Sequence, residues 1–145
     1  MDTQKNIKFK HIITSGLLAG LLILIIGAGL FPILGNQMDE ILESRGVSPM
    51  GTGSMVFFAS ISLVNGIAIV WIYAFIENRF KSKLKAIIIV SVSFWFFTYF
   101  LSNSALVAYG FMPLSFVAIG TIWGLLELFI AALVGAKLYN KVKGD

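Results

Sequence analysis

The chain has no cysteine, a single histidine and few charged residues. Without cysteine it can form no disulfide and no thiolate metal site, and it has no cysteine nucleophile. One histidine, His11, cannot supply a histidine cluster for a metal or a haem within one chain. Charged residues make up 12% of the 145 positions, against roughly 25% in a soluble domain. We therefore expect no metal site and no cofactor, and an environment other than water.

Apolar residues make up most of the sequence. The chain is 58% hydrophobic, and a water-soluble core of this size could not bury so much apolar surface, so lipid must cover part of it. Ile12–Leu34 and Met55–Ile76 are 23 and 22 residues without a charge, and a helix needs about 20 to cross a bilayer. The first run is too long for a signal-peptide core of roughly 7–15 residues, so we expect it to be retained.

The third apolar run, Ala86–Ala136, is 51 residues long and contains one charge, Glu127. As a single helix it would be about 76 Å long, so it must turn back once. We expect the turn at Tyr109–Met112, where Gly110 can end one helix and Pro113 can open the next. The sequence thus predicts a single all-α membrane domain, residues 1–145, that is a bundle of four transmembrane helices at about 12–32, 54–76, 85–108 and 113–138.

Basic residues predict the orientation of the bundle, because lysine and arginine collect in short cytoplasmic loops. The first outer loop contains only Arg45, and the third loop has no charge. The other ten basic residues fall on one side of a four-crossing chain. Both termini should therefore be cytoplasmic, and the net charge of +4 marks orientation, not nucleic-acid binding. The ten are Lys5, Lys8, Lys10, Arg79, Lys81, Lys83, Lys85, Lys137, Lys141 and Lys143.

The first outer loop, residues 35–53, is the only long one. Asn36 can cap a short helix over Gln37–Ser44, which Gly46 would end. Its apolar residues share one face, which is typical of an amphipathic helix lying on the membrane surface. A solvated linker and a lid over a site between the helices are the alternatives.

Small residues on two predicted helices favour close packing. Gly16 and Gly20 form a GxxxG motif in the first helix, and Gly120 and Gly124 form another in the fourth. Gly27 lies outside these motifs, so we expect it to be less sensitive to substitution. The motifs are compatible with contacts inside one chain and with contacts between two chains.

Glu127 is the main candidate for a functional residue. It lies on the same helical stripe as Gly120 and Gly124, so it should point into the bundle. A charged group at the bilayer centre costs about 2.5–3.5 kcal/mol on insertion scales, which makes such residues candidates for function. The other polar candidates are Asn65, expected at similar depth as its partner, Asn103 and Thr121.

Three roles are open for Glu127. As a protonated side chain it would hydrogen-bond across helices and fix the register of the bundle. It could instead carry protons or bind a cation, or line a water-filled pocket. The aromatic run 94–100 is interpreted as bulk that faces lipid and fills gaps, with a site for a flat ligand as the alternative.

The segments 71–80 (WIYAFIENRF) and 123–131 (WGLLELFIA) resemble a set of small bacterial four-helix membrane proteins without an assigned activity. In that set a Trp-x-Tyr-Ala ends the second helix before a basic loop, and a Trp-Gly-x-x-Glu lies in the last helix. The resemblance implies a bacterial inner-membrane protein and no particular chemistry. The small multidrug resistance transporters also have four helices and one membrane glutamate, but theirs lies in the first helix, which has no acid here.

The sequence therefore favours a non-enzymatic structural, accessory or regulatory membrane subunit. The alternative is a small dimeric transporter or channel, proton- or cation-coupled, that uses Glu127. A membrane enzyme ranks last, because no nucleophile and base are paired and no catalytic residue can be named. The expected partners are the lipid bilayer and either a second copy or another membrane protein, with no nucleic acid.

Overall fold

The computed structural model describes residues 9–144, and every regular element in that range is a helix. Four helical stretches are long and apolar enough to cross a bilayer, as the sequence predicted, so the chain is a multi-pass membrane protein. The elements are α1 (Phe9–Ala28), α2 (Phe31–Glu43), α3 (Thr52–Ile76), the 3₁₀ turn η1 (Glu77–Arg79), α4 (Lys83–Trp95), the π-helical turn η2 (Phe96–Phe100), α5 (Leu101–Ala108) and α6 (Leu114–Gly144).

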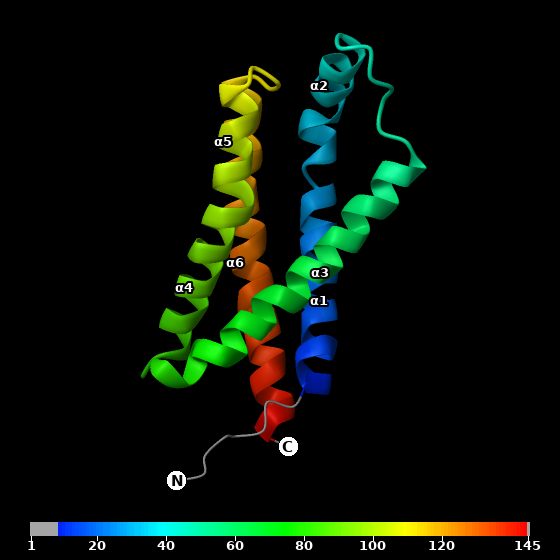
Figure 1. The fold of residues 1–145 in the computed structure, drawn as a ribbon. Helices are drawn as coiled ribbons and strands as arrows, with labels where there is room; N and C mark the ends of the chain where they lie inside the picture. Colours follow the sequence, from blue (N-terminus) through cyan, green and yellow to red (C-terminus); the bar gives the residue numbers. More distant parts are fainter. Residues whose placement is uncertain (1–8, 145) are drawn as a thin grey trace.

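The fourth crossing, α6, is the central helix of the bundle. It packs against α1, against α3 and against the continuous helix formed by α4, η2 and α5. Small side chains on α6 allow this close packing, since Ala131, Ala132 and Ala136 are all buried in the core. Figure 1 shows α3 running diagonally across α1, from the base of α4 to the far side of the bundle. The first half of α3 therefore lies apart from α6.

The crossing of α1 and α3 is a backbone-to-backbone contact. A Cβ atom added to Gly16 would lie 2.5 Å from Cα of Ile67, and one added to Gly20 would lie 2.6 Å from Cα of Leu63. A Cβ at Gly66 of α3 would overlap the backbone of Gly20. Only glycine allows an approach this close, so the first GxxxG motif lies at a helix contact within the chain.

The third crossing is one helix with a wider turn in its middle. Ser82 caps its start by accepting a hydrogen bond from the Lys85 amide at 3.4 Å. The α-helical pattern of α4 passes into the π-helical turn η2 and then continues as α5. The crossing ends at Ala108, and Gly110 follows with a φ of 69°, which is the left-handed conformation that closes helices. The turn before α6 therefore lies where the sequence predicted it.

The short helix α2 differs from its predicted form. It begins at Phe31, six residues before the expected start at Gln37, because Pro32 occupies its first turn and favours a helix start there. Asn36 consequently lies inside the helix and does not cap it. The end of α2 agrees with the prediction, since Gly46 has a φ of 71°. Figure 1 shows α2 running on from α1 in the same general direction, after a break at residues 29–30.

The start of α1, the connection from α3 to α4 and the end of α6 lie together at one end of the bundle (Figure 1). We call this the basic end, and the opposite end, with α2 and the α5–α6 turn, the loop end. Two of the ten basic residues assigned to one side, Lys5 and Lys8, lie outside the described residues. Those at the basic end include Lys10, Arg79, Lys81, Lys83, Lys85, Lys137 and Lys141.

Candidate functional site

Glu127 is enclosed by the bundle. It lies on α6, and only 3% of its surface is exposed. The hydroxyl of Tyr99, from η2, donates a hydrogen bond to its Oε1 atom. A buried carboxyl group requires such a donor, because an unsatisfied polar group in a low-dielectric interior costs free energy. The pair joins the third crossing to the fourth.

Two glycines make room for this pair. A Cβ at Gly124 would overlap the ring of Tyr99, so the second GxxxG motif contributes space for an aromatic side chain. A Cβ at Gly27 of α1 would lie 3.2 Å from Oε2 of Glu127. The sequence placed Gly27 outside the packing motifs, but in the structure it forms one wall of the carboxyl site. A Cβ at Gly120, in contrast, would meet no atom within 4 Å, so this glycine makes no close helix contact among the described residues.

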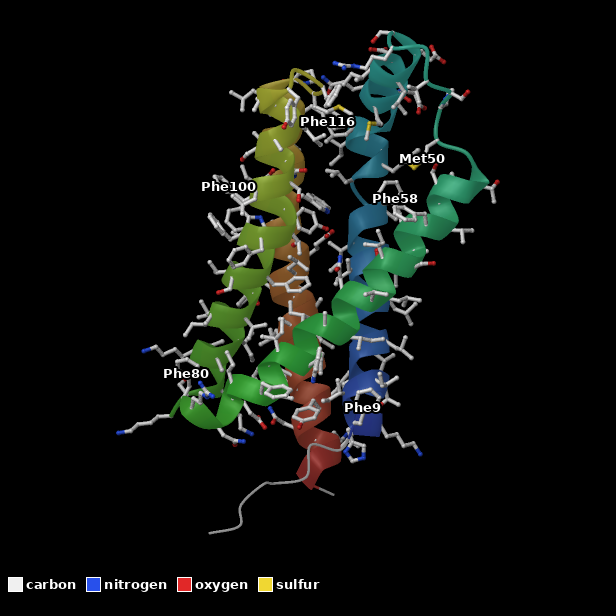
Figure 2. The ribbon with its side chains drawn as sticks, viewed as in Figure 1. Phe9, Met50, Phe58, Phe80, Phe100 and Phe116 are labelled. Atoms are coloured by element: carbon white, nitrogen blue, oxygen red, sulfur yellow. The ribbon has the colours of Figure 1, made fainter. Side chains whose placement is uncertain are left out.

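The π-helical turn brings Tyr99 to this position. A π turn contains one residue more than an α turn and so changes the direction of the side chains within it. Phe96 and Phe100 stack on each other with ring centroids 5.4 Å apart and are exposed, whereas Tyr99 is half-buried against α6. Figure 2 shows Phe100 on the side of the third crossing that faces away from α1. The aromatic run is therefore divided between an exposed side and a half-buried side on which Trp95 and Tyr99 donate hydrogen bonds to α6.

Further hydrogen bonds extend from Glu127 toward the loop end. Asn103 donates to the hydroxyl of Thr121 at 2.9 Å, and the indole of Trp95 donates to the Thr121 carbonyl at 2.8 Å. The indole of Trp123 donates at 3.0 Å to the carbonyl of Ile26 near the end of α1, and the same carbonyl accepts from the Gly29 amide at 3.1 Å. These bonds and the Tyr99–Glu127 pair form a polar seam on α6. Two of the predicted residues, Asn103 and Thr121, are thus brought together.

Asn65 does not belong to this seam. It was expected to be the partner of Glu127, but the structure pairs Glu127 with Tyr99. Asn65 is half-buried on α3 and makes no side-chain hydrogen bond to any residue in the range 9–144. The reason is the diagonal course of α3: beyond its crossing with α1 at Gly66, this helix runs away from α6 (Figure 1).

A second buried polar group lies near the basic end, and sequence reasoning missed it. Asn140 of α6 donates to the hydroxyl of Tyr73 on α3 at 2.8 Å. The rings of Tyr73 and Tyr139 meet edge to face, with centroids 6.4 Å apart. Glu77, one helical turn after Tyr73, is only 6% exposed. The signal in the sequence was the motif Trp-x-Tyr-Ala itself, which places a tyrosine one turn before an acid.

An apolar layer separates the two polar groups. Asn140 follows Glu127 by 13 residues, which is about 20 Å along a helix. The core between them consists mainly of aliphatic side chains and alanine, and the buried Ser91 donates its hydroxyl back to Ile87 of its own helix. Over the described residues no group of three or more His, Cys, Asp or Glu side chains is placed to hold a metal ion. The aliphatic members of the layer include Ile69, Val70, Val90, Leu128, Ala131 and Ala132.

Tyr99 was missed although the sequence contained a signal for it. Trp95, Tyr99 and Asn103 follow one another at intervals of four, so they share a face of one helix. Each of the three carries a hydrogen-bond donor, and each donates to α6 in the structure. The interpretation of residues 94–100 as bulk obscured this polar stripe.

A scan against protein-family models, a search of curated proteins and a search of solved structures each found no match for this chain. The resemblance to small bacterial four-helix membrane proteins therefore stays a prediction from two short segments.

Proposed function

We propose that the chain is a non-enzymatic structural or accessory subunit of the bacterial inner membrane, with both termini in the cytoplasm. In this proposal the Tyr99–Glu127 pair holds the third and fourth crossings in register. The observation that carries it is the enclosure of Glu127: its carboxyl is closed in by Tyr99, Gly27 and the core of the bundle. A buried polar pair of this kind can specify one helix register among several.

The apolar layer supports the same proposal. A group that carries protons or ions needs a route to both sides of the membrane, usually through further titratable groups. About 20 Å of mainly aliphatic core lies between Glu127 and the polar group near the basic end. Within one copy of the described chain, Glu127 is therefore better suited to hold helices together than to exchange protons with the cytoplasm.

A double-mutant cycle tests the proposed role. Tyr99→Phe removes the donor, Glu127→Leu removes the acceptor, and unfolding of the single and double variants is measured in mild detergent. We expect a coupling free energy of about 0.6 kcal/mol, the average for hydrogen bonds between membrane helices, and at most about 1.7 kcal/mol. Tyr109→Phe is the matched control, because Tyr109 is 76% exposed at the end of α5. The absence of coupling between positions 99 and 127 would contradict the role as a register pair.

A second candidate function, proton- or cation-coupled transport by a dimer, is favoured by one observation. The partner of Glu127 lies in a π-helical turn, and such turns are frequent at functional sites. Proteoliposomes with an internal pH dye separate the two candidates. If the chain is a structural subunit, protons should enter these proteoliposomes at the same rate as protein-free liposomes at every pH gradient. A flux that Glu127→Gln abolishes, in a variant that melts like the parent, would favour transport and overturn the first proposal.

A further inference from the structure

A lateral groove opens between the third and fourth crossings in the half of the bundle toward the loop end. Its volume is about 420 Å³. The end of α4, η2 and α5 form one wall, and the first part of α6 forms the other. Glu127 lies deeper in the bundle and does not line it. The lining residues are Trp95, Phe100, Ser104, Val107, Leu114, Val117, Ala118, Thr121 and Ile122.

The walls of the groove are mainly apolar. Ser104 donates its hydroxyl to the carbonyl of Phe100 at 2.6 Å, and the hydroxyl of Thr121 accepts from Asn103 at 2.9 Å. The indole of Trp95 is engaged by the Thr121 carbonyl. Because these polar side chains are already hydrogen-bonded within the chain, the groove offers little to a polar ligand. It suits an apolar occupant.

The length of the groove matches one leaflet of a bilayer. On α6 it extends from Leu114 to Ile122, and on the third crossing from Trp95 to Val107. At 1.5 Å per residue these stretches are about 12 and 18 Å long. Half of a bilayer core of about 30 Å is about 15 Å, the depth that the acyl chains of one leaflet occupy.

A positive charge lies at the mouth of the groove. Its outermost residues, Val107 and Leu114, flank the α5–α6 turn. Arg45 reaches this turn from the end of α2, donates to the carbonyl of Gly110 at 2.8 Å and lies 5.7 Å from the ring centroid of Phe111. A guanidinium group has five N–H donors, and no carboxylate among residues 9–144 forms an ion pair with this one. Donors on Arg45 are therefore available to an anion at the membrane surface.

We infer that this groove binds one phospholipid of the leaflet at the loop end. One acyl chain lies between α5 and α6, and the phosphate accepts hydrogen bonds from the guanidinium of Arg45. Arginine suits this contact because its planar fork matches the oxygens of a phosphate. The inference is independent of the role of Glu127, which neither lines the groove nor contacts Arg45.

Native mass spectrometry of the protein in mild detergent, titrated with phosphatidylglycerol, tests the site. The parent should bind one lipid more tightly than any that follow. Arg45→Gln should weaken that first binding step about fivefold, the effect of one basic residue near a membrane surface. Arg45→Lys, which keeps the charge, should weaken the binding of the first lipid less than Arg45→Gln does. Equal affinity in the parent and in Arg45→Gln would overturn the phosphate contact.

Two alanine substitutions test the position of the acyl chain. Ala118 lines the groove, so Ala118→Phe should fill it and abolish the tight binding step. Ala105 is an exposed residue of α5 outside the groove, so Ala105→Phe is the matched control and should bind as the parent does. Melting temperatures establish that both variants are folded. Tight lipid binding by Ala118→Phe would overturn the proposal. So would the finding that the parent is a dimer and that Ala118→Phe is a monomer, since a second copy would then occupy the groove.

Discussion

Glu127 imposes a cost that its surroundings must offset. A charged residue at the centre of a membrane helix costs about 2.5–3.5 kcal/mol on insertion scales, whereas a hydrogen bond between membrane helices contributes about 0.6 kcal/mol on average. The hydrogen bond from Tyr99 alone therefore does not offset the free-energy cost of placing Glu127 in the membrane. The burial of Glu127 within the bundle, away from lipid, must supply the rest.

Gly27 is the residue where this burial is most easily disturbed. We expect Gly27→Val to destabilise the protein by about 1–3 kcal/mol, the usual cost of overpacking, because the added Cβ would lie 3.2 Å from the carboxyl of Glu127. Ala28→Val is the control, since Ala28 is the next residue along the helix and is exposed. Unfolding in mild detergent measures both. If the two variants unfold alike, Gly27 does not form a wall of the carboxyl site.

The two GxxxG motifs have different surroundings, so one substitution at each provides a matched experiment. Gly20 is in contact with the backbone of α3, while a Cβ added to Gly120 would meet no atom of residues 9–144 within 4 Å. We expect Gly20→Leu to separate α1 from α3 and lower the melting temperature in detergent strongly, and Gly120→Leu to leave it nearly unchanged. A large loss for Gly120→Leu without one for Gly20→Leu would mean that the main helix contact lies between copies of the chain.

The π-helical turn predicts how the third crossing responds to the loss of one residue. Removing one residue from a π turn leaves a regular α-helix, with the segments before and after it still in phase. Deletion of Phe97 should therefore give a folded protein, in which Tyr99 keeps its four-residue spacing to Asn103 on the face toward α6. Deletion of Val92, in regular α-helix, should be far more harmful, because it rotates α4 about 100° relative to α5. Circular dichroism and gel filtration of both variants measure the difference, and two equally misfolded products would contradict the prediction.

The elements show which parts of the fold a single sequence can predict. Apolar runs of about 20 residues identify crossings because the thickness of the bilayer sets their length. The turn at Gly110 was predictable from backbone conformation, because few residues other than glycine adopt a positive φ. The partner of Glu127 was not predictable from depth alone. The sequence predicts a similar depth for Asn65, but in the structure α3 crosses α1 at Gly16 and Gly20, whereas Glu127 lies beside Gly27, about 10 Å further along α1. The position of this crossing depends on contacts between distant glycines.

For the whole molecule, the orientation in the membrane is the main expectation. The bundle has four candidate crossings, and three basic segments lie at one end of it. Because basic segments collect in the cytoplasm, reporter fusions at Lys83 and after Asp145 should report a cytoplasmic location. A fusion at Glu43, at the end of α2, should report an external one. Alkaline phosphatase and green fluorescent protein fusions measure the two sides. A cytoplasmic signal at Glu43 would reverse the proposed orientation and place the phospholipid groove in the inner leaflet.

The hydrogen bond between Tyr99 and Glu127 also has a consequence for biogenesis. Its two residues are only 28 positions apart and belong to consecutive crossings joined by a short turn. During synthesis, Tyr99 leaves the ribosome before Glu127, so the donor is already in place when the acid reaches the insertion machinery. The last two crossings can then enter the bilayer together as a helical hairpin, and the carboxyl group need not meet lipid without a partner.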